Sequence, residues 1–313
     1  MAEKEMHPNE PIKKAIITGA TGYIGFHLTR RLLQLGWQVA VIKRPSSSIG
    51  KLERYKGNVE FFDYNCSTES LKQAMDVFRP DIIFHLASCV IARHKTEQIE
   101  NLINSNVLFG TLLLEAMHLS GVDKIVNAST AWQTAGGCDY KPFSLYAATK
   151  QAFEDILQFY SNVYGIKSIS LRLPDTYGPD DSRSKILNLV HRAAQSGEPL
   201  KMSAGEQEMD LLYIDDVLNG FIKGAELLQT TSEKCSIYSL SSRNPMRLRK
   251  IVELYEAVNG VSVNIEWGAL PYRDNEIMKG AVPNNVLPSW KSKVTLEDGL
   301  RNLSLCQEDV NSI

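Results

Sequence analysis

The segment from residue 18 to residue 25, TGATGYIG, constrains the fold of this chain more than any other. It follows residues 14–17, an apolar run typical of a short buried strand, and it precedes residues 26–35, whose apolar side chains recur at helical spacing. Glycines spaced in this way let a strand turn sharply into a helix and leave the backbone bare. The start of the helix then offers free N–H groups and a positive dipole end, which suit a diphosphate. Taken alone, the segment is also compatible with a tight turn that binds nothing.

A second motif lies about 120 residues further along the chain, where Tyr146 and Lys150 form its only Tyr-x-x-x-Lys. Both belong to residues 145–164, whose apolar spacing predicts a helix, so the phenol and the ammonium project from the same face. A free phenol has a pKa near ~10, and a neighbouring cation lowers it and makes proton transfer practical. The pair by itself is also compatible with an ordinary surface helix.

Apolar runs alternate with helical stretches through the first half of the chain, which predicts a parallel sheet with helices on both faces. The strands are expected at 14–18, 37–42, 58–62, 81–86, 123–129 and 167–173, and the helices at 24–35, 67–78, 97–120 and 145–164. After residue 174 the pattern is irregular and rich in proline and glycine. We therefore expect a smaller second part over 175–313, of which about 211–240 returns to pack on the main sheet.

These motifs, in this order, resemble the extended branch of the short-chain dehydrogenase/reductase superfamily, the NAD-dependent epimerase/dehydratase family, whose members act on nucleotide sugars. The resemblance runs nearly from end to end. Further segments that match the branch lie at 81–87, 106–111, 124–130, 172–179 and 287–300. The resemblance implies a Rossmann-type doubly wound α/β fold, with a cofactor-binding domain over 1–174 and an irregular α/β nucleotide-sugar-binding part over 175–313.

A narrower likeness is to the 4-ketoreductases that make CDP-abequose and CDP-paratose. It is carried by Trp132 and Gln133 after Thr130, by residues 145–154 and by residues 175–181. This resemblance implies hydride transfer from a nicotinamide to the C4 ketone of an NDP-4-keto-6-deoxyhexose.

The resemblance also implies the roles of three catalytic residues. Tyr146 donates the proton to the developing alkoxide, and Lys150 holds the cofactor ribose and lowers the tyrosine pKa. Thr130 donates a hydrogen bond to the same substrate oxygen and orients it.

Relatives with these three residues also dehydrate or epimerise their substrates. The 4,6-dehydratases carry Asp-Glu directly after the catalytic Thr, and the epimerase-reductases that make GDP-fucose carry a Cys two residues after the catalytic Ser. This chain has Ala131 and Trp132 in those places, which disfavours both reactions. A C4 epimerase with tightly held NAD stays possible, as do a ketoreductase of small carbonyl compounds and a non-catalytic NADP-binding regulator. Net reduction is the preferred reading.

The end of the second strand predicts the cofactor. Members that prefer NAD place Asp or Glu there to bind the ribose hydroxyls, whereas this chain has Lys43 and Arg44. Two cations suit a 2′-phosphate, so we expect NADP rather than NAD, although solvated loop cations are the alternative. The cofactor-binding residues that the resemblance implies are Gly19, Thr21, Gly22, Tyr23, Ile24, Gly25, Lys43, Arg44, Asp63 (toward adenine), Leu86, Ala87, Ser88, Asn106, Lys150 and Pro174.

The substrate residues are less regular. Many relatives place an Arg for the sugar-nucleotide diphosphate where this chain has Met209, and an Asn where it has Asp175. Charge compensation must then come from elsewhere. The substrate-binding residues that we expect are Thr130, Asp175, Arg183, Lys185 and Arg273, of which each cation is equally compatible with a solvated surface position.

Composition excludes several classes of partner. The net charge is −2 with no basic block, so neither nucleic acid nor an anionic membrane is expected. No apolar run approaches the length needed to span a bilayer, and the N-terminus lacks the apolar stretch of a signal peptide. The five cysteines are scattered and the histidines lack ligand spacing, which favours a reduced, cytoplasmic protein without a metal. Homodimerisation through the helices at 97–120 and 145–164 is implied by the resemblance.

Overall fold

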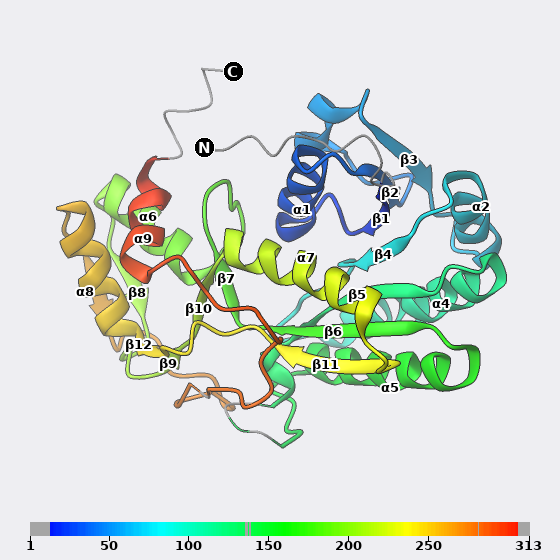
Figure 1. Ribbon diagram of the computed structural model, residues 1–313. Helices are drawn as coiled ribbons and strands as arrows, with labels where there is room; N and C mark the ends of the chain where they lie inside the picture. Colours follow the sequence, from blue (N-terminus) through cyan, green and yellow to red (C-terminus); the bar gives the residue numbers. More distant parts are fainter. Residues whose placement is uncertain (1–12, 135–136, 138, 281, 306–313) are drawn as a thin grey trace.

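The computed structural model describes residues 13–134, 137, 139–280 and 282–305 (Figure 1). Its centre is a seven-stranded sheet in which every neighbouring pair of strands is parallel. In spatial order the strands are β11 (Cys235–Ser239), β6 (Lys167–Leu173), β5 (Lys124–Thr130), β4 (Ile82–His85), β1 (Lys14–Thr18), β2 (Gln38–Lys43) and β3 (Val59–Asp63). The expected Rossmann-type α/β fold is therefore confirmed.

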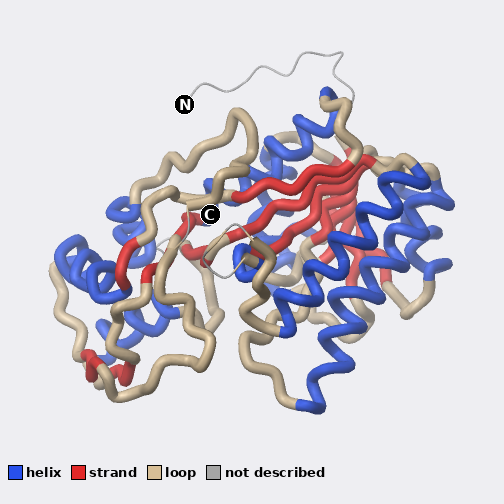
Figure 2. Tube along the Cα trace, turned by 90° about the horizontal axis from the view of Figure 1, so that it is seen from below, coloured by secondary structure: helices blue, strands red, loops and turns tan. Residues whose placement is uncertain are grey.

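Helices cover both faces of this sheet. On one face α1 (Tyr23–Gln34) packs beside α7 (Ile214–Thr230), and α7 lies against β5 and β6 (Figure 1). The opposite face carries α2 (Thr68–Phe78), α4 (Phe109–Ser120) and α5 (Leu145–Tyr164), which run across the sheet in Figure 2. Each layer encloses its own apolar core, and the fully buried Phe84 and Phe153 lie in different ones. Because helices cover both faces of the sheet, a site can lie only at the ends of the strands.

Most expected elements agree with the structure to within about a residue, and the three at 14–18, 145–164 and 167–173 agree at both ends. The expected helix at 97–120 is not uniform. A short 3₁₀ turn (Thr96–Gln98) leads into α3 (Ile99–Ile103), then into a π-helical turn (Asn104–Leu108), and only then into α4. Such π turns are frequent at functional sites. Further 3₁₀ helices span Gly50–Tyr55 and Ala131–Gln133.

The expectation that no apolar segment is long enough to span a bilayer is wrong, because one helical segment has the length and the composition to do so. Among the described residues, the 25-residue helical segment Thr96–Ser120, with a hydropathy of 1.2, meets such a criterion. Leu113, Leu114 and Met117 of this segment are nevertheless fully buried between the sheet and its neighbouring helices. Core helices of soluble proteins pass the same test, so this segment does not imply a membrane protein.

The part of the chain after residue 174 follows directly from the carboxyl end of β6. Its helices are α6 (Ile186–Ser196), α8 (Leu248–Asn259) and α9 (Leu296–Leu305), and its strands form three two-stranded sheets. These pair β7 (Asp175–Tyr177) with β10 (Leu211–Tyr213), β8 (Leu200–Met202) with β13 (Ile265–Trp267), and β9 (Glu208–Met209) with β12 (Met246–Arg247). Because α7 and β11 join the main sheet, the later half of the chain contributes to both parts; the division at 174 stays a prediction.

The segment near the C-terminus is held to the main body by Asp216 on α7. Its carboxylate accepts hydrogen bonds from the backbone N–H groups of Lys293 and Val294, at 3.0 Å each. The indole of Trp290 donates to the backbone carbonyl of the same aspartate at 3.1 Å. One residue on the sheet side therefore fixes the closing segment.

Candidate functional site

The glycine-rich turn joins β1 to α1 and needs glycine for reasons of space. Gly19 has φ +74°, and a Cβ there would lie 2.5 Å from the backbone nitrogen of Ala87. A Cβ at Gly25 would lie 2.2 Å from the carbonyl oxygen of Gly19. Gly22 is the N-cap of α1, no side chain caps the helix, and its first turn has no acidic residue. The N–H groups at this helix start are thus available to an anion, and the turn fits the diphosphate of a dinucleotide.

Three further residues of the turn were predicted to bind the cofactor. Thr21 is exposed at the tip, and Ile24 is half-buried against the core. Tyr23 is held at the start of α1 with Arg183 stacked on its ring, 4.3 Å from guanidinium carbon to ring centroid. Burial, the largest cause, raises the pKa of the Tyr23 phenol well above its usual range.

Arg183 therefore lies near the glycine turn. Its guanidinium donates to the Asp181 carboxylate at 2.7 and 2.8 Å and to the carbonyl and hydroxyl oxygens of Thr176 at 3.1 and 3.2 Å. Arg183 is also absent from the residues lining the large pocket described below. Its predicted contact with the substrate stays a prediction, and its surroundings favour the cofactor side.

The carboxyl ends of β2 and β3 carry the residues expected around the adenosine. Lys43 donates to the Asp63 carboxylate at 2.6 Å, so the two are engaged with each other. Arg44 is exposed and exerts a coulombic effect on Cys89, which places its charge toward the loop after β4.

That loop, residues 86–89, is held by hydrogen bonds to the side chain of Asn106. The Asn106 side-chain oxygen accepts from Ser88 Oγ at 3.0 Å and from the Cys89 N–H at 2.7 Å. Its amide nitrogen donates to the Cys89 carbonyl and to Thr149 Oγ1, both at 2.9 Å. Asn106 is fully buried and its amide is saturated by protein groups, so it acts on the site by shaping the loop that contains Ala87 and Ser88. Leu86 packs against the core beneath it.

The three expected catalytic residues meet at the ends of β5 and α5. Thr130 is the last residue of β5, and Tyr146 and Lys150 lie one turn apart on α5. Tyr146 is hydrogen-bonded to the hydroxyls of Ser88 and Thr130. Thr130 Oγ1 also accepts the N–H of Trp132 at 3.2 Å, which leaves its own proton for Tyr146. The structure thus brings the trio together.

The pKa of Tyr146 runs against the sequence-based expectation. Burial raises it to about 12, and the hydrogen bonds with Ser88 and Thr130 oppose burial without reversing it. Burial likewise lowers the pKa of Lys150 to about 8. Desolvation outweighs the attraction that the spacing of the two residues suggests, so the phenol is protonated at neutral pH.

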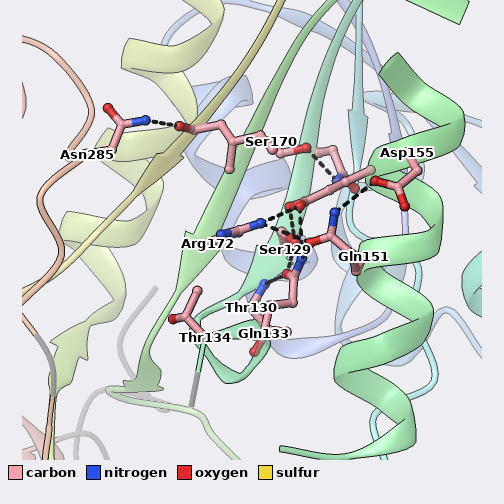
Figure 3. Close-up of polar contacts among 12 residues, drawn as sticks. Ser129, Thr130, Gln133, Thr134, Gln151, Asp155, Ser170, Arg172 and Asn285 are labelled. Carbon is pink, nitrogen blue, oxygen red and sulfur yellow. Dashed lines mark hydrogen bonds and ion pairs between the residues drawn. The ribbon is translucent and has the colours of Figure 1, made fainter. Parts of the chain in front are cut away.

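A buried polar network lies beside the trio and was not predicted as a group (Figure 3). Glu154 on α5 accepts from Arg172 on β6 at 2.7 Å and from the Gln133 amide at 2.8 Å. Ser129 Oγ lies 2.6 Å from Gln133 Oε1 and 2.6 Å from Glu154 Oε1. The sequence holds one signal for it, since a Thr at a strand end with Gln three residues later is a capping box.

A pocket of about 400 Å³ opens between the carboxyl end of the sheet and the smaller part of the chain. Its wall nearest Tyr146 is aromatic: the Trp132 ring lies 6.1 Å from the Tyr146 ring and 5.2 Å from the Phe143 ring, centroid to centroid. Pro174 also lines the pocket. The pocket is therefore apolar at Trp132, whose ring separates it from Tyr146.

Of the expected substrate residues, Asp175, Lys185 and Arg273 line this pocket. Lys185 is paired with Asp175 at 2.6 Å, and its ammonium lies 5.4 Å from the centroid of the Trp132 ring. Lys185 thus carries little uncompensated charge. Lys201, which sequence reasoning missed, also lines the pocket, because β8 brings it there from a sequence position without any motif.

Metal chemistry gains no support from the described part of the chain, which holds no group of three or more His, Cys, Asp or Glu side chains placed for an ion. Cys66, Cys89 and Cys235 are free thiols. Cys138 and Cys306 lie outside the described residues.

Comparison with known proteins gives relatives of two activities. The chain is 28% identical over 269 residues to the CDP-abequose synthase of Yersinia pseudotuberculosis, covering 85% of this chain and 90% of the relative. It is 27% identical over 226 residues to the UDP-glucose 4-epimerase of Mycolicibacterium smegmatis, covering 67% and 72%. These similarities support a nucleotide-sugar-modifying enzyme.

Solved structures agree on the fold. The UDP-glucose 4-epimerase of Thermus thermophilus, in complex with NAD, superposes with a TM-score of 0.80 at 25% identity, covering 96% of this chain and 100% of that one. The UDP-glucose 4-epimerase of Thermotoga maritima, with UDP-glucose, gives a TM-score of 0.83 at 22% identity and shows the fold alone, covering 94% and 98%. A nicotinamide dinucleotide is therefore supported as the cofactor.

The profile of the NAD dependent epimerase/dehydratase family matches residues 15–236, more than half of the 313 residues. This range includes the glycine turn, the loop held by Asn106 and the three residues expected to be catalytic. The chain therefore belongs to the NAD dependent epimerase/dehydratase family.

Proposed function

We propose that this enzyme reduces the C4 ketone of an NDP-4-keto-6-deoxyhexose with a nicotinamide cofactor. The observation that carries the proposal is the state of Tyr146. A reductase needs a proton donor for the alkoxide that forms at C4, and a phenol with a pKa of about 12 is protonated at neutral pH. The likeness to CDP-abequose synthases supports the same substrate class.

In the proposed reaction the bound cofactor supplies a hydride to C4 of the sugar. Tyr146 gives its phenolic proton to the former carbonyl oxygen, so the product is a secondary alcohol. Thr130 donates to the same oxygen or to the tyrosinate left behind, and the Lys150 ammonium stabilises that tyrosinate. Trp132 and Phe143 exclude water from this end of the pocket, which strengthens each of these electrostatic interactions.

A C4 epimerase is the second candidate, favoured by the Mycolicibacterium smegmatis relative. An epimerase must first remove a proton from the C4 hydroxyl, which requires tyrosinate. Because both candidates use Thr130, Tyr146 and Lys150, the preference for a reductase comes from the end of β2, where Lys43 and Arg44 stand in place of a carboxylate and suit an exchangeable NADPH. Dehydration has no support from the residues after Thr130, which are Ala131 and Trp132.

NADP is the proposed cofactor, with Arg44 as the cation for the 2′-phosphate.

A homodimer is also proposed, because apolar side chains on α4 and α5 are exposed: Leu119, Phe159, Val163 and Tyr164. Light scattering coupled to size exclusion tests it. Phe159→Glu should give a monomer if this face is the interface, and an unchanged mass would contradict it.

The test of function is oxidation of NADPH at 340 nm with CDP-, dTDP-, GDP- and UDP-linked 4-keto-6-deoxyhexoses. Tyr146→Phe should abolish turnover, and Tyr140→Phe, which alters an exposed tyrosine in the preceding loop, should not. Turnover with one nucleotide supports the proposal and names the carrier. C4 interconversion of an intact nucleotide sugar with copurified NAD, without net NADPH oxidation, would replace the reductase by the epimerase.

A further inference from the structure

The Glu154 carboxylate is the centre of the polar network beside the catalytic residues. Its side chain is 1% exposed, and groups on three different elements converge on it. Ser129 reaches it from the end of β5, Gln133 from the turn that follows, and Arg172 from β6, at 2.6, 2.8 and 2.7 Å. A buried carboxylate with this many partners is fixed in position.

The network reaches the catalytic threonine through Gln133. Gln133 Oε1 accepts the backbone N–H of Thr130 at 3.3 Å, while its amide nitrogen donates to Glu154 and, at 2.9 Å, to Gln151. Displacing Glu154 would therefore release the end of β5 that presents Thr130.

The network also faces Lys150, which lies one helical turn before Glu154 on α5. Lys150 is 1% exposed, and its ammonium lies 5.7 Å from the Phe153 ring centroid. The ionisable groups that share its helix face or interact with its charge are Tyr146 and Glu154 from its own helix and His85 from β4. Arg172 on β6 is connected to it through Glu154. Burial lowers the pKa of Lys150, and Glu154 acts in the opposite direction.

His85 supplies no compensating charge at this site. Its Nδ1 is hydrogen-bonded to Thr18 Oγ1 at 2.8 Å, and burial followed by the Lys150 charge lowers its pKa well below the usual range. Arg172 adds a second cation. Glu154 thus pairs directly with the half-buried Arg172 and lies one helical turn from the buried Lys150.

We propose that Glu154 is a positioning residue of this enzyme, acting as the counter-ion of Lys150 while it fixes Thr130 through Gln133. The inference rests on the proposed function only for the task of Lys150, which is to stabilise the tyrosinate and hold the cofactor ribose. Without Glu154, the buried Lys150 would lose its proton at a lower pH and the site would lose its cation near neutrality.

The test is a titration of Lys150 itself in the full chain, by NMR of protein labelled with [13Cε]lysine. The resonance lost in Lys150→Met identifies the residue. Its midpoint should lie near pH 8 in the unaltered protein. In Glu154→Gln it should move to lower pH. In Asp155→Asn, which removes the exposed carboxylate next to it while keeping an acceptor for Gln151, it should stay in place.

Arg172→Gln provides a test in the opposite direction, and it also serves if Glu154→Gln fails to fold. Glutamine can still donate to Glu154, but one cation is gone, so the Lys150 midpoint should move to higher pH. A purely structural role would not produce shifts of opposite sign in two variants of one network. A midpoint that Arg172→Gln leaves unchanged or lowers, or that Glu154→Gln leaves unchanged, overturns the proposal.

The titration needs neither cofactor nor sugar, so it separates this inference from the proposed reaction. Shifted midpoints together with no reductase activity would retain the counter-ion and reject the reductase. Unshifted midpoints in a working reductase would reject the counter-ion role of Glu154 and retain the proposed reaction.

Discussion

Lys43 and Asp63 form an ion pair across the carboxyl ends of β2 and β3, with 2.6 Å between Nζ and Oδ1. The Lys43 side chain is 17% exposed and the Asp63 side chain 58%, so the pair lies at the surface with Lys43 on its inner side. The Lys43 ammonium is already neutralised by Asp63 and is therefore poorly suited to bind a phosphate. Arg44, the next residue, is exposed on the side of the loop after β4 and becomes the residue on which a preference for NADP depends.

Arg44→Ala should therefore weaken the binding of NADPH and leave that of NADH nearly unchanged. A charge-assisted hydrogen bond to phosphate contributes roughly 1.5–3 kcal/mol, which corresponds to a loss of affinity of roughly 10- to 100-fold. Quenching of protein fluorescence by each cofactor measures both dissociation constants. Arg54→Ala, at an exposed cation in the following 3₁₀ helix, is the control. An equal loss for both cofactors would mean that Arg44 does not read the 2′-phosphate.

Lys150→Met should stabilise the folded chain at neutral pH while it abolishes activity. In the folded chain the pKa of Lys150 is lowered to about 8, whereas an unfolded lysine titrates near ~10.4. Between these values the unfolded chain binds more protons, so the free energy of unfolding of the unaltered protein rises with pH. The methionine variant lacks this pH dependence, and its free energy of unfolding at pH 7 should be higher by on the order of 1–3 kcal/mol.

Urea unfolding at pH 7 and pH 10 measures this difference. The advantage of the methionine variant should shrink as pH rises toward 10. A variant that is less stable than the unaltered protein at pH 7 would show that the buried ammonium is not a cost to the fold.

Thr130→Val should lower kcat with little effect on cofactor binding. The hydroxyl accepts the Trp132 N–H and is hydrogen-bonded to Tyr146, so valine removes the polar link and keeps the shape. Loss of an oxyanion-type donor lowers kcat by roughly 10²- to 10³-fold. Thr130→Ser, which keeps the hydroxyl, should retain most activity in the same steady-state assay. Comparable losses in both variants would assign the effect to the missing methyl group instead.

Gly25→Ala should destabilise the fold and prevent cofactor binding. Its Cβ would lie 2.2 Å from the Gly19 carbonyl oxygen and 2.7 Å from the Ala20 Cα, both backbone atoms that cannot rotate away. Overpacking of this kind costs about 1–3 kcal/mol. Gly57→Ala is the matched control, since a Cβ there meets no atom within 4 Å. Thermal unfolding with and without cofactor compares the two, and equal melting temperatures would contradict the steric argument.

The parts of the site that could be predicted are those formed by residues close together in the sequence. The glycine turn requires only a strand, three small residues and a helix, and these are adjacent in the chain. Tyr146 and Lys150 share a helix face because four residues make about one turn. The order of these motifs also identified the family.

The parts that could not be predicted depend on burial and on distant partners. The sequence spacing suggests a lowered pKa for Tyr146, yet the closed site raises it, because desolvation is a property of everything packed around the phenol. The sequence predicts a cofactor contact for Lys43 and a substrate contact for Arg183, whereas in the structure Asp63 pairs with Lys43 and Asp181 with Arg183.

The parallel α/β fold, the family and the helix face shared by Tyr146 and Lys150 follow from local patterns, because period, glycine spacing and helical geometry act over a few residues. Three features follow only from tertiary packing: which cations remain uncompensated, how Asn106 holds the loop after β4, and how Glu154 joins Arg172 directly and Thr130 through Gln133. Those relationships join β4, β5, β6 and α5. Their strength depends on exclusion of water, which exists only once the layers have closed around them.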